Sequence, residues 1–375
     1  MPQIQRRLIT YCTNIHPGES WQETFTALRQ HLPAVKSAVS PSAQFPIGLR
    51  LSNIAASQLS ETENRKFKTW LEEQDCFIPT LNGFPFGSFH NDRVKEQVYL
   101  PDWRSPERTA YTNRLADLLA GWLPEHLTGS ISTVPLGFKG VVTKEDLPAI
   151  MKQLQGVLAH LVTIYEEHGK KIMLALEPEP GCLLETTDEV CSFFENLELP
   201  DRLRSHLGLC YDCCHQAVEF EEPAASLARL KASGVEIAKY QISSALKVVD
   251  PALPLLQPFA EPCYLHQVVI RRRDGTIARY MDLGPALADH DRQPGDEWRC
   301  HFHVPIFQDQ YDGLSTTRSF LEELLPEVPA GILLEVETYT WEVLPPSLRC
   351  EPVTGSIIRE ISWLKEQLNA AYSRP

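Results

Sequence analysis

The chain has 375 residues, 43% of them hydrophobic and 22% charged. This composition is typical of a globular protein with a buried core and excludes a disordered chain. The formal net charge of -14 argues against general binding to nucleic acid, because affinity for phosphates depends on Lys and Arg. No apolar run approaches the roughly 18–20 residues that span a bilayer, so we expect no transmembrane segment.

The first residues do not have the pattern of a secretory signal. Arg6 and Arg7 are followed only by Leu8 and Ile9 before polar Thr10, so the apolar centre of a signal peptide is missing. We therefore expect a cytoplasmic protein. Its ten cysteines are then expected to be reduced thiols rather than a disulfide framework.

Short apolar runs alternate with longer helical patterns along the chain. Several of the short runs are almost continuously apolar, as in strands of a parallel sheet that is covered on both faces. The predicted strands are residues 8–13, 46–51, 77–81, 130–135, 171–176, 207–211, 236–242 and 332–336. The main predicted helices are residues 21–36, 107–123, 145–167, 216–232, 317–325 and 355–372.

Helix start signals support this alternation. Capping boxes begin at Ser20, Ser60 and Thr186, each with Glu three residues later. Eight strands that alternate with about eight helices predict an α/β fold of the (β/α)8 TIM-barrel type, in a single domain over residues 1–375. The main alternative, a doubly wound open sheet, usually has fewer strands.

One segment interrupts the alternation. About ninety residues separate the seventh and eighth predicted strands. Within them, Asp274-Gly275 lies between two strand-like runs, residues 264–273 and 276–281, which predicts a β-hairpin. A third run follows at 300–307. We assign residues 247–310 to an insertion after strand seven, which places it on the catalytic face of the barrel.

Ionisable residues follow several predicted strands directly. Carboxylates in such places are costly unless they are paired, protonated or bound to a cation. A mixed set of carboxylates and imidazoles suits a divalent metal such as Zn, Mn or Fe. The candidate ligands are Glu177 after strand five, Asp212 and His215 after strand six, His301 and His303 in the insertion, and Glu335 in strand eight.

Two of these choices stay open. Glu179 and Glu337 each lie two residues beyond a candidate ligand, on the same face if the strand continues. A single Glu at a strand end can also be no more than a partner in a salt bridge. We expect Glu179, Glu337 and Trp341 at least to contact the substrate.

The ends of strands one and three offer polar and aromatic groups for a pocket wall. Asn14, His16 and Asn82 are predicted to orient a ligand there, among aromatic residues that exclude water. The alternative is that these loops, rich in turn residues, pack on themselves.

Motifs spread over nearly the whole chain resemble the EboE family, the metabolite traffic proteins of the ebo gene cluster. They are Thr-Tyr-Cys-Thr-Asn-Ile-His-Pro-Gly-Glu-Ser-Trp at 10–21, Leu-Asn-Gly-Phe-Pro-Phe-Gly at 81–87, and segments 98–103, 176–181, 211–215, 301–305 and 334–341. The resemblance implies a xylose isomerase-like TIM barrel, the superfamily of sugar isomerases, epimerases and endonuclease IV. It also implies a small-molecule metabolite as ligand, other ebo-cluster proteins as partners, and a link to secondary-metabolite precursors.

The superfamily pattern carries over to single positions. Its strand-five Glu matches Glu177, its Asp-x-x-His motif matches Asp212 and His215, and its strand-eight Glu matches Glu335. Where many members have a His ligand after strand seven, this chain has Gln241, a weaker and neutral ligand. The His pair at 301 and 303 lies where some members carry an Asp-x-His pair, and His266 is a further candidate.

The resemblance and the ligand set together favour an isomerase or epimerase, with Glu177 or Glu335 moving a proton as general base. One alternative is metal-dependent hydrolysis. Another is a metabolite carrier that has lost turnover, which Gln241 favours. The sequence contains no Gly-rich phosphate loop, so we do not expect it to use ATP or NAD.

Overall fold

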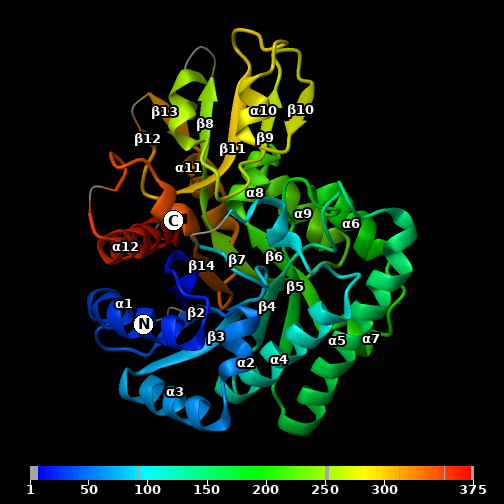
Figure 1. The fold of residues 1–375 in the computed structure, drawn as a ribbon, viewed down its shortest axis with the longest axis vertical. Coiled ribbons are helices and arrows are strands. Elements are labelled where there is room, and N and C mark those ends of the chain that lie inside the picture. Colours follow the sequence, from blue (N-terminus) through cyan, green and yellow to red (C-terminus); the bar gives the residue numbers. More distant parts are fainter. Residues whose placement is uncertain (1–6, 91–92, 250–252, 312, 350, 373–375) are drawn as a thin grey trace.

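A parallel sheet of eight strands forms the centre of the molecule (Figure 1). The computed structural model describes residues 7–90, 93–249, 253–311, 313–349 and 351–372. The strand order is β1-β14-β7-β6-β5-β4-β3-β2, which confirms the predicted TIM barrel and its eight strands. They are β1 (Leu8–Tyr11), β2 (Phe45–Arg50), β3 (Cys76–Asn82), β4 (Gly129–Thr133), β5 (Ile172–Leu176), β6 (Leu207–Asp212), β7 (Ile237–Ile242) and β14 (Leu333–Val336).

A side chain helps to close the barrel between β1 and β2. An isolated bridge joins Cys12 to Gly48. Two residues before Cys12, the Thr10 hydroxyl donates to the carbonyl oxygen of Pro46 at 2.7 Å and accepts from the N–H of Gly48 at 3.1 Å. The barrel is therefore nearly closed, and the Thr10 hydroxyl satisfies backbone groups that a regular ladder would otherwise pair.

Helices cover the outside of the barrel (Figure 1). They are α1 (Trp21–Val39), α2 (Asn53–Gln58), α3 (Glu61–Glu73), α4 (Pro106–Trp122), α5 (Leu147–His168), α6 (Thr187–Glu195), α7 (Asp201–Arg204), α8 (Cys213–Val218), α9 (Pro223–Ala232), α11 (Arg318–Leu324) and α12 (Val353–Tyr372). The capping boxes at Ser20 and Thr186 are present, and Ser60 caps α3 by accepting from the N–H of Glu63.

The helix predicted over 216–232 is wrong as a single element. The structure has two helices there, α8 and α9, joined by a short link before Pro223. Pro has no N–H to continue a helix and is well suited to the first helical position, so α9 begins anew at Pro223.

A second, antiparallel sheet is inserted between β7 and β14 and projects beyond the barrel at the top of Figure 1. Its order is β10-β9-β11-β8-β13-β12. The strands are β8 (Ser244–Val249), β9 (Val268–Arg271), β10 (Ile277–Tyr280), β11 (Glu297–Val304), β12 (Gln310–Tyr311) and β13 (Leu314–Thr316), with the short helix α10 (Leu283–Leu287) after β10.

The insertion confirms the predicted hairpin, because β9 and β10 pair antiparallel on either side of Asp274-Gly275. The strands β8, β12 and β13 were not anticipated. The register of β11 against β8 shifts between Cys300 and Val304, where the chain carries the His301-x-His303 motif. Such irregularities re-aim side chains and are frequent next to active sites. The domain limits of 247–310 stay a prediction; the sheet itself extends from Ser244 to Thr316.

In the part of the chain that the structure describes, no helix is both long and apolar enough to cross a membrane.

The Thr10 hydroxyl gives a test of barrel closure. Thr10→Val keeps the shape of the side chain but leaves the buried N–H of Gly48 without its partner. An unsatisfied buried donor costs about 1–3 kcal/mol, so urea denaturation should show a loss of this size in the free energy of unfolding. The control Thr163→Val, on the exposed face of α5, should change stability by less than about 0.5 kcal/mol. An unchanged Thr10→Val would contradict this role for the hydroxyl.

Candidate metal centre

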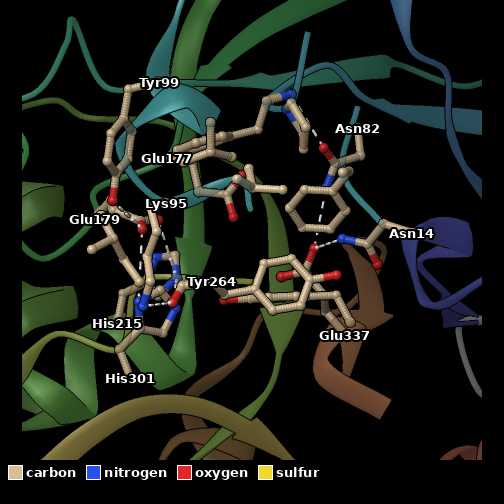
Figure 2. A pocket seen from close by; sticks show the side chains of 17 residues that line it. Asn14, Asn82, Lys95, Tyr99, Glu177, Glu179, His215, Tyr264, His301 and Glu337 are labelled. Atoms are coloured by element: carbon tan, nitrogen blue, oxygen red, sulfur yellow. Dashed lines mark hydrogen bonds and ion pairs between the residues drawn. The ribbon is translucent and has the colours of Figure 1, made fainter. Parts of the chain in front are cut away.

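A cavity lies where the barrel strands end and the insertion begins. It encloses about 500 Å³ of space, part of it open to solvent. Figure 2 shows acidic, imidazole and amide side chains turned toward it from separate segments of the chain. The polar residues that line it are Asn14, Asn82, Lys95, Tyr99, Glu177, Glu179, His215, Tyr264, His301, Glu337 and Tyr339, and the apolar ones include Phe84, Phe89 and Leu265.

Three carboxylates meet at the end of the barrel. Glu177 follows β5, Asp212 ends β6, and Glu337 follows β14. One oxygen from each of these carboxylates lies within 4.8 Å of the others. Parallel strands bring residues that are distant in sequence to the same edge of the barrel, which is why the three converge.

Glu337 lies between three amide side chains. Its Oε1 accepts hydrogen bonds from the Nδ2 of Asn14 at 2.8 Å, the Nδ2 of Asn82 at 3.1 Å and the Nε2 of Gln241 at 3.2 Å. Figure 2 shows the first two. The amides therefore fix this carboxylate, and its Oε2 lies 3.8 Å from Nδ1 of His303.

Asp212 is fixed by the start of α8. Its Oδ1 accepts from the backbone N–H of His215 at 3.0 Å, as a helix N-cap, and from the hydroxyl of Ser243 at 2.7 Å. The spacing Asp-x-x-His thus serves both local structure and the site, because the capped turn also carries the imidazole of His215 toward the cavity.

Burial shifts the acidity of these groups. Burial and the neighbouring Asp212 carboxylate raise the pKa of Glu177 to about 7. Burial and the charge of Glu177 raise the pKa of Glu337 well above its ordinary value. Burial opposes the charged form of Asp212 too, but His215, His303 and its hydrogen bonds hold its pKa below the usual value.

Three histidines gather beside the carboxylates. The Nε2 of His301 lies 3.1 Å from the Nε2 of His215 and 3.3 Å from the Nε2 of His303. The Oε2 of Glu179 is 3.5 Å from the Nε2 of His215. Burial and the neighbouring His215 lower the pKa of His301 well below its ordinary value, so its ring is neutral near pH 7.

Two residues that hold this cluster are not among the site residues predicted from the sequence, although Tyr99 lies within the motif at 98–103. Gln267 donates from Nε2 to the Tyr99 hydroxyl oxygen at 2.7 Å, and Tyr99 donates in turn to Oε1 of Glu179 at 3.0 Å. Both residues lie outside the regular strands of the barrel, where no periodic pattern marks an inward side chain. Hydrogen-bonding groups of this kind can be found only after the fold is known.

The loop between β3 and α4 forms part of the cavity wall and is tied to the insertion. Nζ of Lys95 donates to the carbonyl oxygen of Tyr264 at 2.5 Å and to Oδ2 of Asp282 at 2.7 Å. The backbone N–H groups of Val94 and Lys95 both donate to the carbonyl of Cys263 at 2.9 Å. The insertion therefore holds this loop over the cavity.

Glu335 does not reach the cluster. Its carboxylate lies deeper in the barrel, and Oε2 is 2.5 Å from Nζ of Lys239 in a fully buried ion pair. A Cβ at position 48 would come within 1.7 Å of Oε1 of Glu335, so Gly48 leaves the room for this side chain. Period two places Glu335 and Glu337 on one face, but only Glu337 is at the mouth.

Three other expected pocket residues lie away from the cavity. His16 contacts the Tyr11 hydroxyl at 3.2 Å and stacks on His31. His266 bonds through Nε2 to Glu261 and through Nδ1 to the carbonyl of His301, so it supports β11 from behind. Trp341 is buried in the hydrophobic core.

The carboxylate cluster has the donors that a divalent cation needs. Oε2 of Glu177, Oδ2 of Asp212 and Oε1 of Gln241 are buried and have no hydrogen-bond partner among the described residues. Buried oxygens without a partner are rare and costly. A cation next to them would compensate both the lost hydration and the repulsion between the carboxylates. The residues present therefore fit a metal.

Comparisons with known proteins bear on the fold. No protein-family model matches the sequence, and no curated protein matches it. A solved D-tagatose 3-epimerase-like protein superposes with a TM-score of 0.52 at 13% identity, over 98% of each chain. A xylose isomerase domain protein from Planctomyces limnophilus gives 0.53 at 11% identity, over 97% of each chain. The IOLI protein with a bound zinc atom gives 0.50 at 15% identity, over 97% of this chain and 99% of its own.

At these identities the similarity establishes the fold alone. This chain has a TIM-barrel fold similar to the folds of these three proteins. In this chain an antiparallel sheet is inserted into the barrel fold after β7, and His301 and His303 of the cluster come from this insertion.

The pKa of Glu177 predicts a pH dependence of the metal-free protein. A rise from 4.5 to about 7 means that the folded state favours the protonated form of Glu177. The free energy of unfolding is therefore highest below about pH 4.5, and it falls as the pH rises toward about 7. At about 1.4 kcal/mol per unit, the loss is about 3 kcal/mol. In a chelator, Glu177→Gln should therefore gain stability relative to the parent between pH 5 and 8, measured by denaturation. The control Glu198→Gln, at an exposed position, should show the same dependence of stability on pH as the parent. If the stability of Glu177→Gln also varied with pH in parallel to the parent, the assignment would be contradicted.

The buried ion pair predicts a structural role for Glu335. Lys239→Met leaves the Glu335 carboxylate buried without its cation. We expect this to lower the free energy of unfolding by about 3–5 kcal/mol. The double variant Lys239→Met/Glu335→Met replaces the pair by apolar chains and should recover most of this loss. Metal content, measured by mass spectrometry, should stay at the parent level in the double variant. Loss of metal there would show that Glu335 is a ligand after all.

Proposed function

We propose that this chain is a divalent-metal-dependent isomerase or epimerase that acts on a small polyhydroxylated carbonyl compound. The observation that carries the proposal is the convergence of Glu177, Asp212 and Glu337 on one cavity, with unpartnered oxygens on Glu177 and Asp212 and on the neighbouring Gln241. We assign these four residues as the ligands of the divalent cation, with Glu337 in the role that the sequence motifs suggested for Glu335. Oxygen donors of this kind suit Mn²⁺ or Mg²⁺.

Two carboxylates are placed to move a proton. A bound divalent cation would supply positive charge to a substrate oxygen that becomes negative when the neighbouring C–H loses its proton. Glu177 would take up this proton as the general base. Glu337, whose pKa burial raises well above its ordinary value, would return a proton to carbon. The net change is then a shift or inversion at carbon, with no redox partner required.

The cavity wall favours an unphosphorylated substrate. Among the described residues that line the cavity, Lys95 is the one Lys or Arg, and its ammonium is already bound to Asp282 and to the carbonyl of Tyr264. A phosphate group would thus find no free cationic side chain there. Aromatic rings such as Tyr99 and Tyr264 would instead pack against the carbon skeleton and exclude water.

A finer assignment rests on the sequence motifs. The similarity of residues 10–21 and of the later motifs to the EboE family supports a role in the processing or traffic of a secondary-metabolite precursor. We propose that the protein acts in the cytoplasm with other products of an ebo cluster. Co-purification of the tagged protein with those gene products from its own host would test this assignment.

Proton exchange in D₂O tests the reaction without knowledge of the product. The protein, loaded with Mn²⁺ or Mg²⁺, is incubated with a panel of unphosphorylated aldoses, ketoses and cyclitol ketones. Deuterium should enter at the carbon next to the carbonyl of at least one compound, detected by NMR. Loss of the general base typically costs 10²–10⁴-fold, so Glu177→Gln should exchange at least about 100-fold more slowly.

Glu360→Gln is a matched control for this experiment. Glu360 is also fully buried with a pKa raised to about 7 by burial, but its Oε1 accepts from Thr338 and from the N–H of Ile306, away from the cavity. This variant should exchange like the parent. Binding of a panel compound with no exchange, by a protein that contains its metal, would contradict the isomerase proposal and favour the carrier.

A further inference from the structure

We propose that the substrate carries a flat apolar group, an aromatic ring, beside the hydroxylated carbonyl head that faces the carboxylate cluster. The inference rests on the proposed function for the head and adds the chemical class of its substituent. Its basis is one apolar side of the cavity. We call this side the apolar wall and define it by the lining residues Phe84, Pro85, Phe89, Val94, Val98 and Leu265.

The apolar wall comes from two segments that are separate from the ends of the barrel strands bearing the carboxylates. Five of its residues belong to the loop between β3 and α4, and Leu265 belongs to the insertion, shortly before β9. The contacts of Lys95 hold these two segments together over the cavity. A substrate whose carbonyl faces the cluster therefore turns its other end toward the apolar wall.

The apolar wall has few hydrogen bonds to offer a ligand. Its side chains are hydrocarbon, and several of its backbone groups are already engaged. The N–H of Phe84 donates to Oδ1 of Asn82 at 3.2 Å, and the N–H of Phe89 donates to Oε1 of Glu19 at 2.7 Å. The N–H of Val94 donates to a carbonyl of the insertion at 2.9 Å.

Polar groups next to the apolar wall are engaged as well. The Tyr99 hydroxyl donates to Glu179 and accepts from Gln267, and the ammonium of Lys95 is bound to the insertion. A hydroxyl of a sugar chain placed here would lose its hydrogen bonds to water without gaining others, which is unfavourable. An apolar group gains from burial at the same place. The wall therefore selects against a polyol chain.

Three aromatic rings form a corner of the cavity beside the apolar wall. The ring centres of Phe89 and Tyr264 are 5.2 Å apart, those of Phe89 and Tyr339 are 5.2 Å apart, and those of Tyr264 and Tyr339 are 5.1 Å apart. The rings come from the loop after β3, from the insertion and from the segment after β14. All three line the cavity, and Figure 2 labels Tyr264 among its side chains.

This aromatic corner favours a ring over a flexible chain as the substituent. Each of its rings contacts the other two, so their orientations are fixed before a ligand binds. Aromatic pairs prefer tilted or edge-to-face arrangements with centres about 4.5–7 Å apart, and they add stability beyond the area that they bury. A preformed apolar surface also spares the ligand the cost of ordering side chains.

A matched pair of ketones tests the inference by binding alone. The first is erythrulose, and the second carries a benzyl group in place of the terminal hydroxymethyl group of erythrulose. Both have the same head, a hydroxymethyl ketone with a neighbouring hydroxyl. Titration calorimetry of the Mn²⁺-loaded protein should give a dissociation constant at least about tenfold lower for the benzyl compound, as expected for burial of an aromatic side chain.

A variant of the apolar wall shows where the benzyl group binds. Val98 is half-buried in the wall, and Val98→Asn replaces its methyl groups by an amide. The ratio of the two dissociation constants should fall about tenfold, close to the value of two methyl groups. Val141→Asn is the matched control, because Val141 is 52% exposed and does not line this cavity. It should keep the ratio of the parent.

The conservative variant Val98→Thr decides if circular dichroism shows that Val98→Asn is unfolded. Threonine has the shape of valine and exchanges one methyl group for a hydroxyl, so the ratio should fall at least about threefold. Thr at this position would also supply a hydrogen bond to a polar chain, so erythrulose should bind no more weakly than it does to the parent.

Two results would overturn the inference. The first is equal or weaker binding of the benzyl compound by the parent, which would mean that the apolar wall only excludes water. The second is a ratio that the folded Val98 variants leave unchanged. Tight binding of the benzyl compound without deuterium exchange would contradict the isomerase proposal and leave this inference in place. Exchange of erythrulose with equal binding of both ketones would do the reverse.

Discussion

Charged groups lose hydration when they are buried, and this barrel and its insertion bury four carboxylates and three imidazoles around one cavity. Most of the polar structure nearby compensates for that loss. Three amides hold Glu337, a helix N-terminus and Ser243 hold Asp212, and carbonyl or amide oxygens hold the outer nitrogens of the histidines. After these bonds, one buried oxygen each of Glu177, Asp212 and Gln241 has no hydrogen-bond partner among the described residues. The requirement for positive charge is thus built into the fold.

Glu335 in β14 and Glu337 just after it have different environments because they lie at different depths in the barrel. Glu335 is paired with Lys239 inside the barrel, in the space that Gly48 leaves. Glu337, two residues later, lies at the mouth among amides. The ion pair makes the interior electrically neutral below the site: its Glu335 carboxylate raises the pKa of Glu337 and its Lys239 ammonium lowers it.

The sequence alone was sufficient for the barrel and for most of the cluster. Apolar runs and capping boxes mark the strands and helices, and the strand-end rule then brings Glu177, Asp212 and His215 together. Period two could not choose between Glu335 and Glu337, because it gives the face of a strand and not the depth. Gln267 and Tyr99 lie in irregular segments, and their contacts depend on tertiary structure. The break between α8 and α9 could have been found from Pro223.

The insertion supplies what the barrel lacks. Near its end, β7 carries neutral Gln241, whose Nε2 donates to Glu337 and whose Oε1 has no hydrogen-bond partner among the described residues. The imidazoles of His301 and His303 come instead from β11. His303 is fixed through Nδ1 to the carbonyl of Glu337, so a strand of the insertion and the end of a barrel strand hold each other in place. Since Lys95 also ties the loop after β3 to the insertion, the inserted sheet both adds imidazoles to the cluster and shapes the wall of the cavity.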